Sequence, residues 1–432
     1  MKTYSVVLIG AGHRGNRYTN IMKNCPEKFK VVAVAEPIKG RRDAIQHKHN
    51  LPDDMCFTSW EEVLSKPKMA DIVLICTMDN MHYEPAMKAI ELGYDILLEK
   101  PAAQTAQECV DIAHAAEKKG VRVLVCHVLR YAPFFKKVKQ LIMDGAVGDI
   151  MSVIHVEAVG NVHQSHSYVR GNWHCQAETT PMLMAKSCHD IDIIQWLLDK
   201  PCKKVQSFGD LSYFNSEHAP EGAPVRCIDG GCPIESTCPY NCKKLYYDDK
   251  KNSWFRGACT RGIAKTDIPT DDEVMTALKT TDYGLCVFHA NNDVVDHQVV
   301  NMEFEGGVTA SFTMNAFNKG GRYIRIFGTK GELYAYADEQ EITLYTFEDK
   351  QHHKIQTNAI DESILSGHGG GDQGIVHELY DYLSGNYNGY CAADINISAK
   401  NHLIGFAAEK ARNLGTVEDV DTFFEEYDLV NE

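Results

Sequence analysis

The chain lacks any run of 18 consecutive apolar residues, so we expect no membrane-spanning helix. It is also short of positive charge: 44 Lys and Arg stand against 59 Asp and Glu, which gives a net charge of -15. This balance argues against a broad surface for nucleic acid or for anionic membranes, but it leaves room for a small ligand in a local pocket. The 432 residues contain no internal repeat and no low-complexity segment, and for this length two domains are the default expectation.

The N-terminal apolar run ends in a glycine-rich turn instead of a small-residue cleavage site, which predicts that no signal peptide is present. The 15 cysteines are an odd number, and several of them, such as Cys76 and Cys126, lie in apolar, strand-like runs. This pattern is typical of reduced, buried thiols rather than of a disulfide framework. We therefore expect a cytoplasmic protein.

Short apolar runs alternate with helical patterns in the first third of the chain. The runs lie at residues 5–10, 31–36, 71–77, 94–100 and 121–127. Near-continuous hydrophobicity is typical of parallel strands that are covered on both faces, and the alternation with helices predicts a doubly wound sheet. We expect an N-terminal Rossmann dinucleotide-binding domain over residues 1–128, followed by a second domain over residues 129–432.

The first of these strands leads directly into a G-x-G-x-x-G turn and then into a helical stretch. The turn would bring backbone amides close to a pyrophosphate and consists of Gly10, Gly12, His13, Arg14 and Gly15. Glu36 ends the second strand about twenty residues later, as the motif requires. Its carboxylate can accept the ribose hydroxyls and would repel a 2′-phosphate, so NAD(H) is the favoured cofactor. Arg41 and Arg42 follow closely and keep NADP(H) open as the less favoured one.

In a sheet of this kind the ligand lies beyond the carboxyl ends of the strands. Three polar clusters lie there by this interpretation, at residues 76–82, 97–102 and 125–131. In the second cluster Pro101 keeps the preceding residue extended as the chain leaves the strand. Lys100 is therefore expected to point into the crevice where a nicotinamide ring would lie.

The glycine turn, Glu36 and the segments "CTMDNMH", "EKP" and "CHDID" resemble the Gfo/Idh/MocA oxidoreductases. The resemblance implies a C-terminal α/β domain with an open, mostly antiparallel sheet that supports a homo-oligomer, either a dimer or a tetramer. It also implies a tightly held nicotinamide cofactor and a sugar, glycoside or cyclitol substrate. It gives Lys100 a part in substrate binding and proton transfer, and it assigns further residues of the three polar clusters to the cofactor site: Thr77, Asn80, His82, Glu99 and His127.

The pattern changes after about residue 130, where alternating runs and glycine-turn hairpins predict an antiparallel sheet independently of the resemblance. Residues 160–178 precede the expected substrate helix and are rich in histidine and aromatic residues, so they form either a sugar-binding wall or a polar surface loop. Residues 366–374 contain three consecutive glycines and either line the pocket or cap the helix that follows. The substrate-binding candidates in these two segments are Tyr168, Arg170, Trp173, His174, His368 and Asp372.

The segment "AKSCHDID", residues 185–192, precedes an apolar run and is expected to begin the substrate helix. In a helix Lys186 and His189 share one face, as do His189 and Asp192. Histidine has a pKa suited to removing a hydroxyl proton as hydride leaves. We therefore predict that His189 and Lys100 lead the chemistry and that Lys186 and Asp192 assist. The alternative is an ordinary helix start, in which His189 caps nearby groups.

One position in this segment departs from the family pattern. The family usually has an aspartate four positions before the histidine, whereas this chain has Ala185 there, with Lys186 beside it. Either Lys186 takes over part of the aspartate's role, or the chemistry differs from simple alcohol oxidation.

Residues 215–260 have the composition of an insertion and contain four cysteines spaced C-x4-C-x5-C-x3-C. These are Cys227, Cys232, Cys238 and Cys242. Four thiolates among glycine and proline turns can bind a structural Zn²⁺ tetrahedrally, and an iron–sulfur cluster is the second option. The alternative is a lid or an oligomer loop with free or partly oxidised cysteines.

Taken together, these features predict an NAD(H)-dependent oxidoreductase that acts on a ring hydroxyl. The subgroup with "RGNW", "CHD" and "GHGGGD" elements resembles the chain most closely, and it includes NAD-dependent glycosidases and 3-keto-glycoside enzymes. The first alternative is therefore a glycosidase or lyase that uses NAD catalytically, because a transient 3-keto group acidifies the neighbouring C–H and permits elimination. A non-catalytic NAD-binding sensor subunit is the second alternative.

Overall fold

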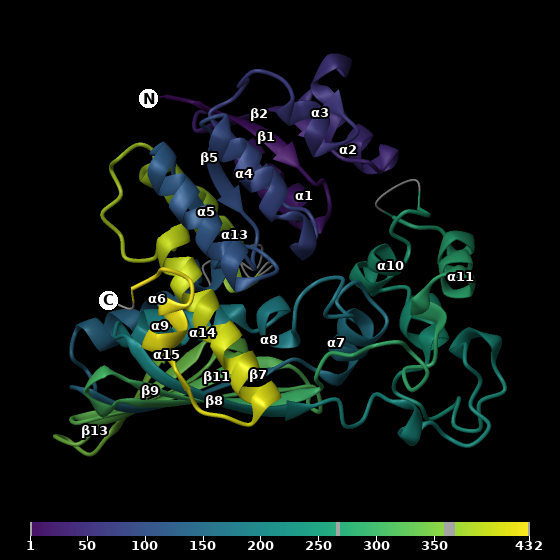
Figure 1. The fold of residues 1–432 in the computed structure, drawn as a ribbon. Helices are drawn as coiled ribbons and strands as arrows, with labels where there is room; N and C mark the ends of the chain where they lie inside the picture. Colours follow the sequence, from purple (N-terminus) through teal and green to yellow (C-terminus); the bar gives the residue numbers. More distant parts are fainter. Residues whose placement is uncertain (1, 265–267, 358–367, 431–432) are drawn as a thin grey trace.

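The computed structural model describes residues 2–264, 268–357 and 368–430, and two sheets organise them (Figure 1). The first sheet has six parallel strands in the order β3-β2-β1-β4-β5-β6. They are β1 (Tyr4–Ile9), β2 (Phe29–Ala35), β3 (Cys56–Phe57), β4 (Ile72–Ile75), β5 (Asp95–Leu98) and β6 (Val123–Val125). The helices between them are α1 (His13–Lys23), α2 (Lys39–His49), α3 (Trp60–Leu64), α4 (Tyr83–Glu91) and α5 (Ala106–Lys119). The predicted Rossmann fold is confirmed.

The central strands β1 and β4 are almost wholly buried because helices cover both faces of the sheet. All four residues of β4 are buried, which explains the absence of polar alternation in the sequence. The helix α5 begins at a capping box formed by Thr105 and Glu108 and ends at Gly120, which adopts the left-handed conformation. The short strands therefore end at a common edge, and the polar clusters of the sequence follow them there.

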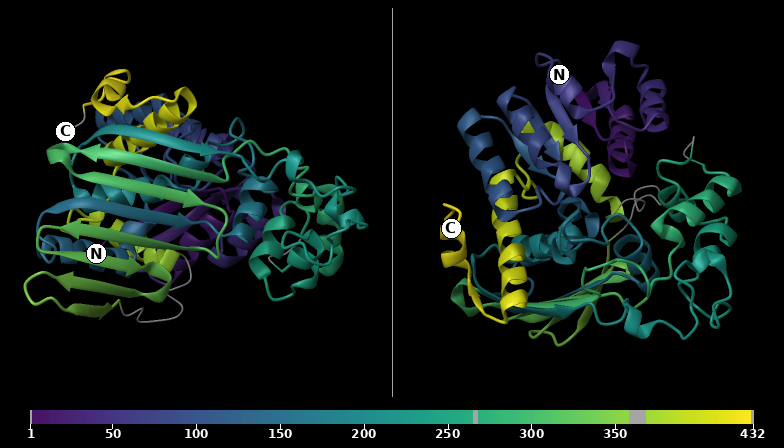
Figure 2. Two further views of the ribbon diagram at one scale, coloured as in Figure 1. Left: turned by 90° about the horizontal axis from the view of Figure 1, so that it is seen from below. Right: turned by 45° about the vertical axis from the view of Figure 1, so that its right-hand side comes forward.

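The second sheet is nine-stranded and mixed, in the order β14-β13-β12-β11-β7-β10-β9-β8-β15. All of its pairings among the described residues are antiparallel except that of β7 with β10. Its strands are β7 (Ile150–Ala158), β8 (Cys202–Asp210), β9 (His297–Phe304), β10 (Thr309–Asn315), β11 (Gly321–Gly328), β12 (Gly331–Tyr336), β13 (Glu341–Thr346), β14 (His352–Gln356) and β15 (Glu418–Asp419). Figure 2 shows one face of this sheet without helices, so the predicted open, mostly antiparallel sheet is confirmed.

The other face of the second sheet carries the helices that connect it to the first. They are α6 (Pro133–Met143), α7 (Asn161–Gln164), α8 (Met182–Ala185), α9 (Cys188–Leu198), α13 (Gly371–Leu383), α14 (Ile395–Leu414) and α15 (Val420–Glu425). Helix α13 packs on α1, and α14 packs on both α5 and α9. The C-terminal part of the chain therefore returns to the Rossmann domain and holds α9 close to the edge where β5 and β6 end.

The insertion between β8 and β9 covers residues 211–296 and is longer than the segment expected from the cysteines. It contains α10 (Ser253–Cys259), α11 (Asp271–Thr280) and short helical turns, and it projects from one side of the molecule (Figure 2). All 15 cysteines are free thiols, and nine of them are buried. Within the described ranges, no helix combines the length and the apolar character that a membrane span requires.

Candidate functional site

The glycine turn after β1 is tight enough to require glycine. Gly10 has φ 86°, and a Cβ on it would lie 2.5 Å from the carbonyl oxygen of Cys76. A Cβ on Gly15 would lie 2.1 Å from the carbonyl oxygen of Gly10. Helix α1 begins after Gly12 without a side-chain cap, so its first amides remain available to a ligand. This cradle fits a dinucleotide pyrophosphate, and the neighbouring His13 is exposed.

Glu36 lies at the carboxyl end of β2, where the motif requires an acceptor for the ribose. Its carboxylate is buried and accepts hydrogen bonds from the amides of Ala11 (2.7 Å) and Ile38 (2.9 Å). Arg42 donates to the main-chain carbonyls of Glu36 and Pro37. The negative charge is therefore fixed beside the glycine turn, which fits an adenosine ribose without a 2′-phosphate.

A cluster of ion pairs links Arg14, Glu99 and Asp372, so these three side chains bind one another. Arg14 Nε lies 2.7 Å from Glu99 Oε1, and Arg14 Nη2 lies 2.7 Å from Asp372 Oδ1. Burial would raise the pKa of Glu99, but the charges of Arg14 and Lys100 outweigh this effect and lower it. The cluster joins α1, the end of β5 and α13, so it fixes the position of Lys100.

The predicted cofactor residues of cluster 76–82 have different roles in the structure. His82 is buried with its Nδ1 2.7 Å from the carbonyl oxygen of Pro101, and Thr77 Oγ1 donates to the carbonyl of Met81. Asn80 is exposed. Asp79, which sequence reasoning missed, is buried and accepts hydrogen bonds from Trp173 Nε1 and Thr180 Oγ1, each at 3.2 Å. Asp79 therefore ties loop 160–178 to the Rossmann edge.

Lys100 and His189 come together at the centre of the site. Lys100 Nζ donates to the main-chain carbonyl of Ala185 at 2.7 Å. This contact involves the main chain of position 185, so it does not replace the aspartate side chain that the family usually has there. The side chain of His189 is 4% exposed, and its Nδ1 has no hydrogen-bond partner among the described residues. A buried ring nitrogen without a partner is available to a ligand.

The electrostatic surroundings keep His189 neutral. Burial and then the charge of Lys100 lower its pKa well below 6.5, with smaller contributions from His368, His127 and Arg322. The rings of His127 and His368 lie 5.9 Å and 5.7 Å from that of His189. Burial also lowers the pKa of His127, to about 4. His189 can therefore accept a proton at neutral pH.

A cavity of about 490 Å³ is lined by residues of two segments, 129–186 and 321–369. It reaches His189 through His368, whose ring lies 5.7 Å from that of His189, and neither His189 nor Lys100 is one of its lining residues. Lys186 projects into it, with Nζ 3.2 Å from Glu157 Oε1, and does not pair with Asp190. Burial lowers the pKa of Lys186, and the charge of Glu157 opposes this shift. Glu157 and Arg322 form direct cross-strand partners on β7 and β11. These two cavity residues were missed because nothing in the local sequence brings them together.

Asp192 does not face this cavity. Both of its carboxylate oxygens are taken by Arg130, at 2.8 Å and 2.7 Å, and Asn401 donates to Oδ1 at 2.7 Å. Burial would raise the pKa of Asp192, but Arg130, His127 and Asn401 hold it below its ordinary value. Arg130 and Asn401 thus hold the Asp192 side chain of α9 in place, and it is not one of the residues that line the cavity.

The four substrate-binding candidates of loop 160–178 lie in different parts of the structure. Trp173 packs against Tyr168 and reaches Asp79, so these two aromatic residues lie near the Rossmann edge. His174 Nδ1 lies 2.8 Å from the carbonyl of Gly171 within the loop itself. Arg170 faces the insertion, where Nε donates to the carbonyl of Leu285 and Nη2 to that of Tyr240. None of the four lines the cavity beside His189.

The glycine run of residues 366–374 both lines the cavity and begins a helix; its first two residues lie outside the described part of the chain. His368 and Gly369 line the cavity. Gly371 begins α13 and packs against the main chain of Val128, where a Cβ on Gly371 would lie 2.1 Å from the carbonyl oxygen of Val128. Asp372 Oδ1 lies 3.0 Å from His368 Nδ1, so the buried cluster also positions this histidine.

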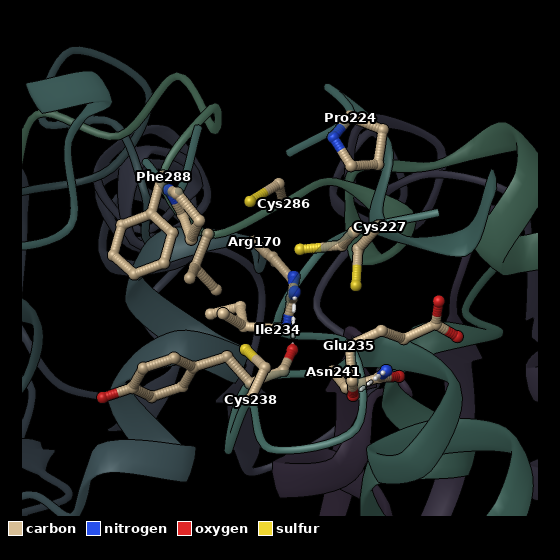
Figure 3. Close-up of a pocket in the computed structure, with 13 residues that line it drawn as sticks. Arg170, Pro224, Cys227, Ile234, Glu235, Cys238, Asn241, Cys286 and Phe288 are labelled. Atoms are coloured by element: carbon tan, nitrogen blue, oxygen red, sulfur yellow. Dashed lines mark hydrogen bonds between the residues drawn. The ribbon is translucent and has the colours of Figure 1, made fainter. Parts of the chain in front are cut away.

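The four cysteines that were predicted from their spacing to bind a metal do not lie together in the structure. Cys242 is fully buried, its amide donates to Cys227 Sγ at 3.4 Å, and its thiol faces the carbonyl of Gly284. Cys227, Cys232 and Cys238 instead line a separate small cavity together with Cys286 (Figure 3). Within the described ranges, no three His, Cys, Asp or Glu side chains have the arrangement of a metal site.

The buried histidines make the stability of the fold sensitive to acid. Burial lowers the pKa of His127 to about 4 and those of His166 and His402 to about 3. Below pH 6.5 the unfolded chain binds protons that the folded chain does not. Each of these histidines should therefore reduce the free energy of unfolding by up to about 1.4 kcal/mol per pH unit between its two pKa values.

Urea unfolding at about pH 7 and about pH 5 measures this loss. The matched variant is His402→Gln, because His402 accepts from the amide of Ala102 (3.0 Å) while its Nδ1 lies 2.6 Å from the carbonyl of Ser398. The free energy of unfolding of His402→Gln should fall less between the two pH values than that of the wild type. The difference should equal the contribution of about one histidine. A free energy of unfolding that is equal at both pH values would contradict this account.

Known proteins match the chain over most of its length. YteT of Bacillus subtilis (strain 168), a protein named as an oxidoreductase, is 27% identical over 336 residues, which cover 73% of each chain. A 2,7-anhydro-N-acetylneuraminate hydratase of Mediterraneibacter gnavus is 26% identical over 198 residues, or 46% of this chain and 50% of the hydratase. A solved levoglucosan dehydrogenase in complex with NADH and L-sorbose has a TM-score of 0.70 and 17% identity, with 97% of this chain and 99% of that chain covered.

Two family models match adjoining parts of the chain. Residues 4–127 match the NAD-binding Rossmann fold of an oxidoreductase family, and residues 139–396 match the C-terminal alpha/beta domain of the same family. Together they cover the first sheet, the insertion and all strands of the second sheet except β15. The chain belongs to the Gfo/Idh/MocA oxidoreductase family.

Proposed function

We propose that this chain is an NAD(H)-dependent oxidoreductase that transfers hydride between nicotinamide and a ring carbon bearing a hydroxyl group in a sugar, glycoside or cyclitol. The observation that carries the proposal is His189, a buried neutral imidazole with a free Nδ1 beside Lys100. Both residues lie near the carboxyl edge of a sheet that the family uses to bind NAD. The likeness to a levoglucosan dehydrogenase supports a carbohydrate substrate.

The chemistry of the proposed step divides between the cofactor and three side chains. When bound, NAD⁺ supplies the hydride acceptor. His189 Nδ1 would take the hydroxyl proton, because the neutral imidazole is the form that accepts one. Lys100 would place its side-chain nitrogen close to the substrate oxygen, where a donor stabilises developing negative charge. The carbonyl of Ala185 uses one of the three ammonium protons of Lys100 and leaves two for the substrate.

The cavity beside His189 has the size and lining that a monosaccharide or cyclitol needs. Its volume of about 490 Å³ lies within the usual range of small-molecule pockets. Lys186, Arg322, His163 and His368 supply polar groups from four different segments. Phe134 and Phe135 supply apolar surface for the less polar face of a ring. The open side of the second sheet would remain free for a second subunit, as the predicted homo-oligomer requires.

A second candidate function follows from Lys186. Simple alcohol oxidation needs one base, yet the cavity also holds the Lys186–Glu157 pair, and burial lowers the pKa of this lysine. Such a pair can move a proton at a carbon next to a transient ketone, as elimination from a glycoside or hydration requires. The similar hydratase supports a reaction without net redox change. In that case NAD would be used catalytically.

One experiment separates these functions. The protein is incubated with NAD⁺ and a panel of cyclitols, free hexoses and aryl glycosides, while NADH absorbance and aglycone release are both recorded. Accumulation of NADH in step with substrate loss supports the dehydrogenase. Release of aglycone without accumulation of NADH supports the redox-neutral glycosidase or lyase and overturns the dehydrogenase. Binding of NAD⁺ with no turnover of any compound would favour the sensor subunit.

The choice between NAD(H) and NADP(H) rests on Glu36. Its fixed carboxylate beside the glycine turn supports NAD(H), because a 2′-phosphate would face a buried negative charge. Titration of the protein with each reduced cofactor, followed by nicotinamide fluorescence, compares the two affinities directly. Equal or tighter binding of NADPH would overturn this assignment.

A further inference from the structure

A small cavity in the insertion gathers four thiols from two distant segments. Its volume is about 20 Å³, and it is lined by Cys227, Cys232, Cys238 and Cys286 together with Arg170 and a mostly apolar wall. In Figure 3 the side chains of Cys227, Cys238 and Cys286 surround that of Arg170. The cavity lies apart from the one beside His189 and is not used by the proposed function.

Backbone pairing explains why Cys286 joins cysteines that lie about fifty residues earlier. Arg226 and Leu285 form an antiparallel bridge, and the amide of Cys286 donates to the carbonyl of Val225 at 2.9 Å. This bridge brings the chain segments of Cys227 and Cys286 side by side. Cys232 and Cys238 are brought in by tight turns, because the amide of Cys238 donates to the carbonyl of Ile234 at 2.8 Å. The convergence is therefore built by main-chain hydrogen bonds.

Arg170 brings a buried positive charge to the cavity. Arg170 is 2% exposed, and its Nε and Nη2 donate to main-chain carbonyls, but its Nη1 has no acceptor there. A buried guanidinium with a free N–H requires an anionic partner nearby. Glu235 also borders the cavity, but one of its carboxylate oxygens accepts from the amide of Gly231 at 3.2 Å. Thiolates at this cavity would add negative charge close to Arg170.

We propose that Cys227, Cys232, Cys238 and Cys286 bind one structural Zn²⁺ ion. Four thiolates around Zn²⁺ carry a net charge of about −2, which the guanidinium of Arg170 would partly neutralise. The cavity holds roughly one water-sized body, which suits a single ion and not a multi-iron cluster. The thiols as placed do not form a closed ligand set. Binding would require rotation about χ1, the one torsion that moves a cysteine sulfur, to reach the Zn–S distance of about 2.3 Å.

The ion would fix the insertion, which has little other internal support. Its helices are short, and its buried apolar residues fall into two small clusters around Tyr246 and Phe214. Small units with little core commonly depend on a metal for their fold. Arg170 connects this cavity to loop 160–178, so metal binding would also hold that loop in place.

The test is the metal content of the full-length protein, purified without chelator and measured by inductively coupled plasma mass spectrometry. We expect about one Zn²⁺ per chain, released when a mercurial reagent titrates the thiols. Replacement by Co²⁺ should give the intense sulfur-to-cobalt charge-transfer bands of a tetrahedral thiolate site. A protein that stays metal-free after Zn²⁺ is supplied in the presence of a weak chelator would overturn the proposal.

Matched cysteine variants identify the ligands. Cys286→Ser should retain zinc at least about tenfold less well against the chelator, whereas Cys242→Ser and Cys56→Ser should retain it like the wild type. Cys286→His keeps a zinc ligand and should restore binding with weaker sulfur-to-cobalt bands, which excludes simple misfolding as the cause of a loss. Unchanged zinc binding in Cys286→Ser, or an equal loss in Cys242→Ser, would overturn the assignment.

Discussion

Replacement of His189 by alanine is expected to lower kcat by about 10²- to 10⁴-fold, which is the range for removal of a general base. The imidazole is buried, neutral and without a partner at Nδ1 among the described residues, so its removal leaves the hydroxyl proton without its proposed acceptor. Affinity for NAD(H) should stay within about threefold of the wild type, because the glycine turn and Glu36 are distant from the change. Steady-state kinetics with the best substrate of the panel, together with cofactor titration, measures both quantities.

The pH profile sharpens this expectation. The reaction requires the neutral imidazole, and its pKa lies well below 6.5. Activity is therefore present above that lowered pKa and is lost as the pH falls through it, so the acid limb of kcat/KM should lie below pH 6.5. His114→Ala removes an exposed histidine on α5 and serves as the control with unchanged kinetics. A wild-type kcat in His189→Ala, or an acid limb above pH 6.5, would refute the assignment.

Lys100→Met should reduce kcat/KM by about 10²- to 10³-fold, as for the loss of one donor to a developing oxyanion. Methionine keeps the length of the side chain but removes the charge and the hydrogen bond to the carbonyl of Ala185. The loss should appear mainly in kcat, because the charge matters most when the substrate oxygen carries negative charge. Initial rates over a range of substrate concentrations separate the two parameters.

The control for Lys100→Met is Lys88→Met, which removes a surface lysine of α4 that pairs with Glu91. Its kinetic parameters should match those of the wild type.

The Lys186→Met variant adds a second comparison. If the protein catalyses the redox-neutral reaction, this variant should slow aglycone release far more than hydride transfer. If Lys100→Met retains full activity, Lys100 has no part in the chemistry.

The sequence predicted the Rossmann half in detail because its signals are local. Continuous apolar runs mark strands buried on both faces, and the glycine turn marks a position where a Cβ would clash with the backbone. The approach of Lys100 to the segment that begins at Ala185 was also expected, since both segments carry recognisable motifs. In each case the residues that matter are neighbours in the chain or belong to one short pattern.

The remaining parts of the site depend on tertiary pairing. Glu157 and Arg322 face each other only because β7 and β11 pair in one register. Asp192 was expected to assist catalysis, yet Arg130 and Asn401 arrive from two other segments and bind its carboxylate. In the same way Cys286, and not Cys242, lines the thiol cavity because of a backbone bridge that the spacing of the cysteines does not reveal.

The central claim is that hydride passes between a substrate carbon and nicotinamide at the site formed by Lys100 and His189. A single-turnover experiment tests it directly: protein in excess over NAD⁺ is mixed rapidly with the substrate panel, and nicotinamide reduction is followed by absorbance. We predict a transient or lasting NADH signal in the wild type and its loss in the Lys100→Met/His189→Ala double variant. Absence of the signal from a wild-type protein that binds NAD⁺ and consumes substrate, or an undiminished signal in the double variant, would contradict the claim.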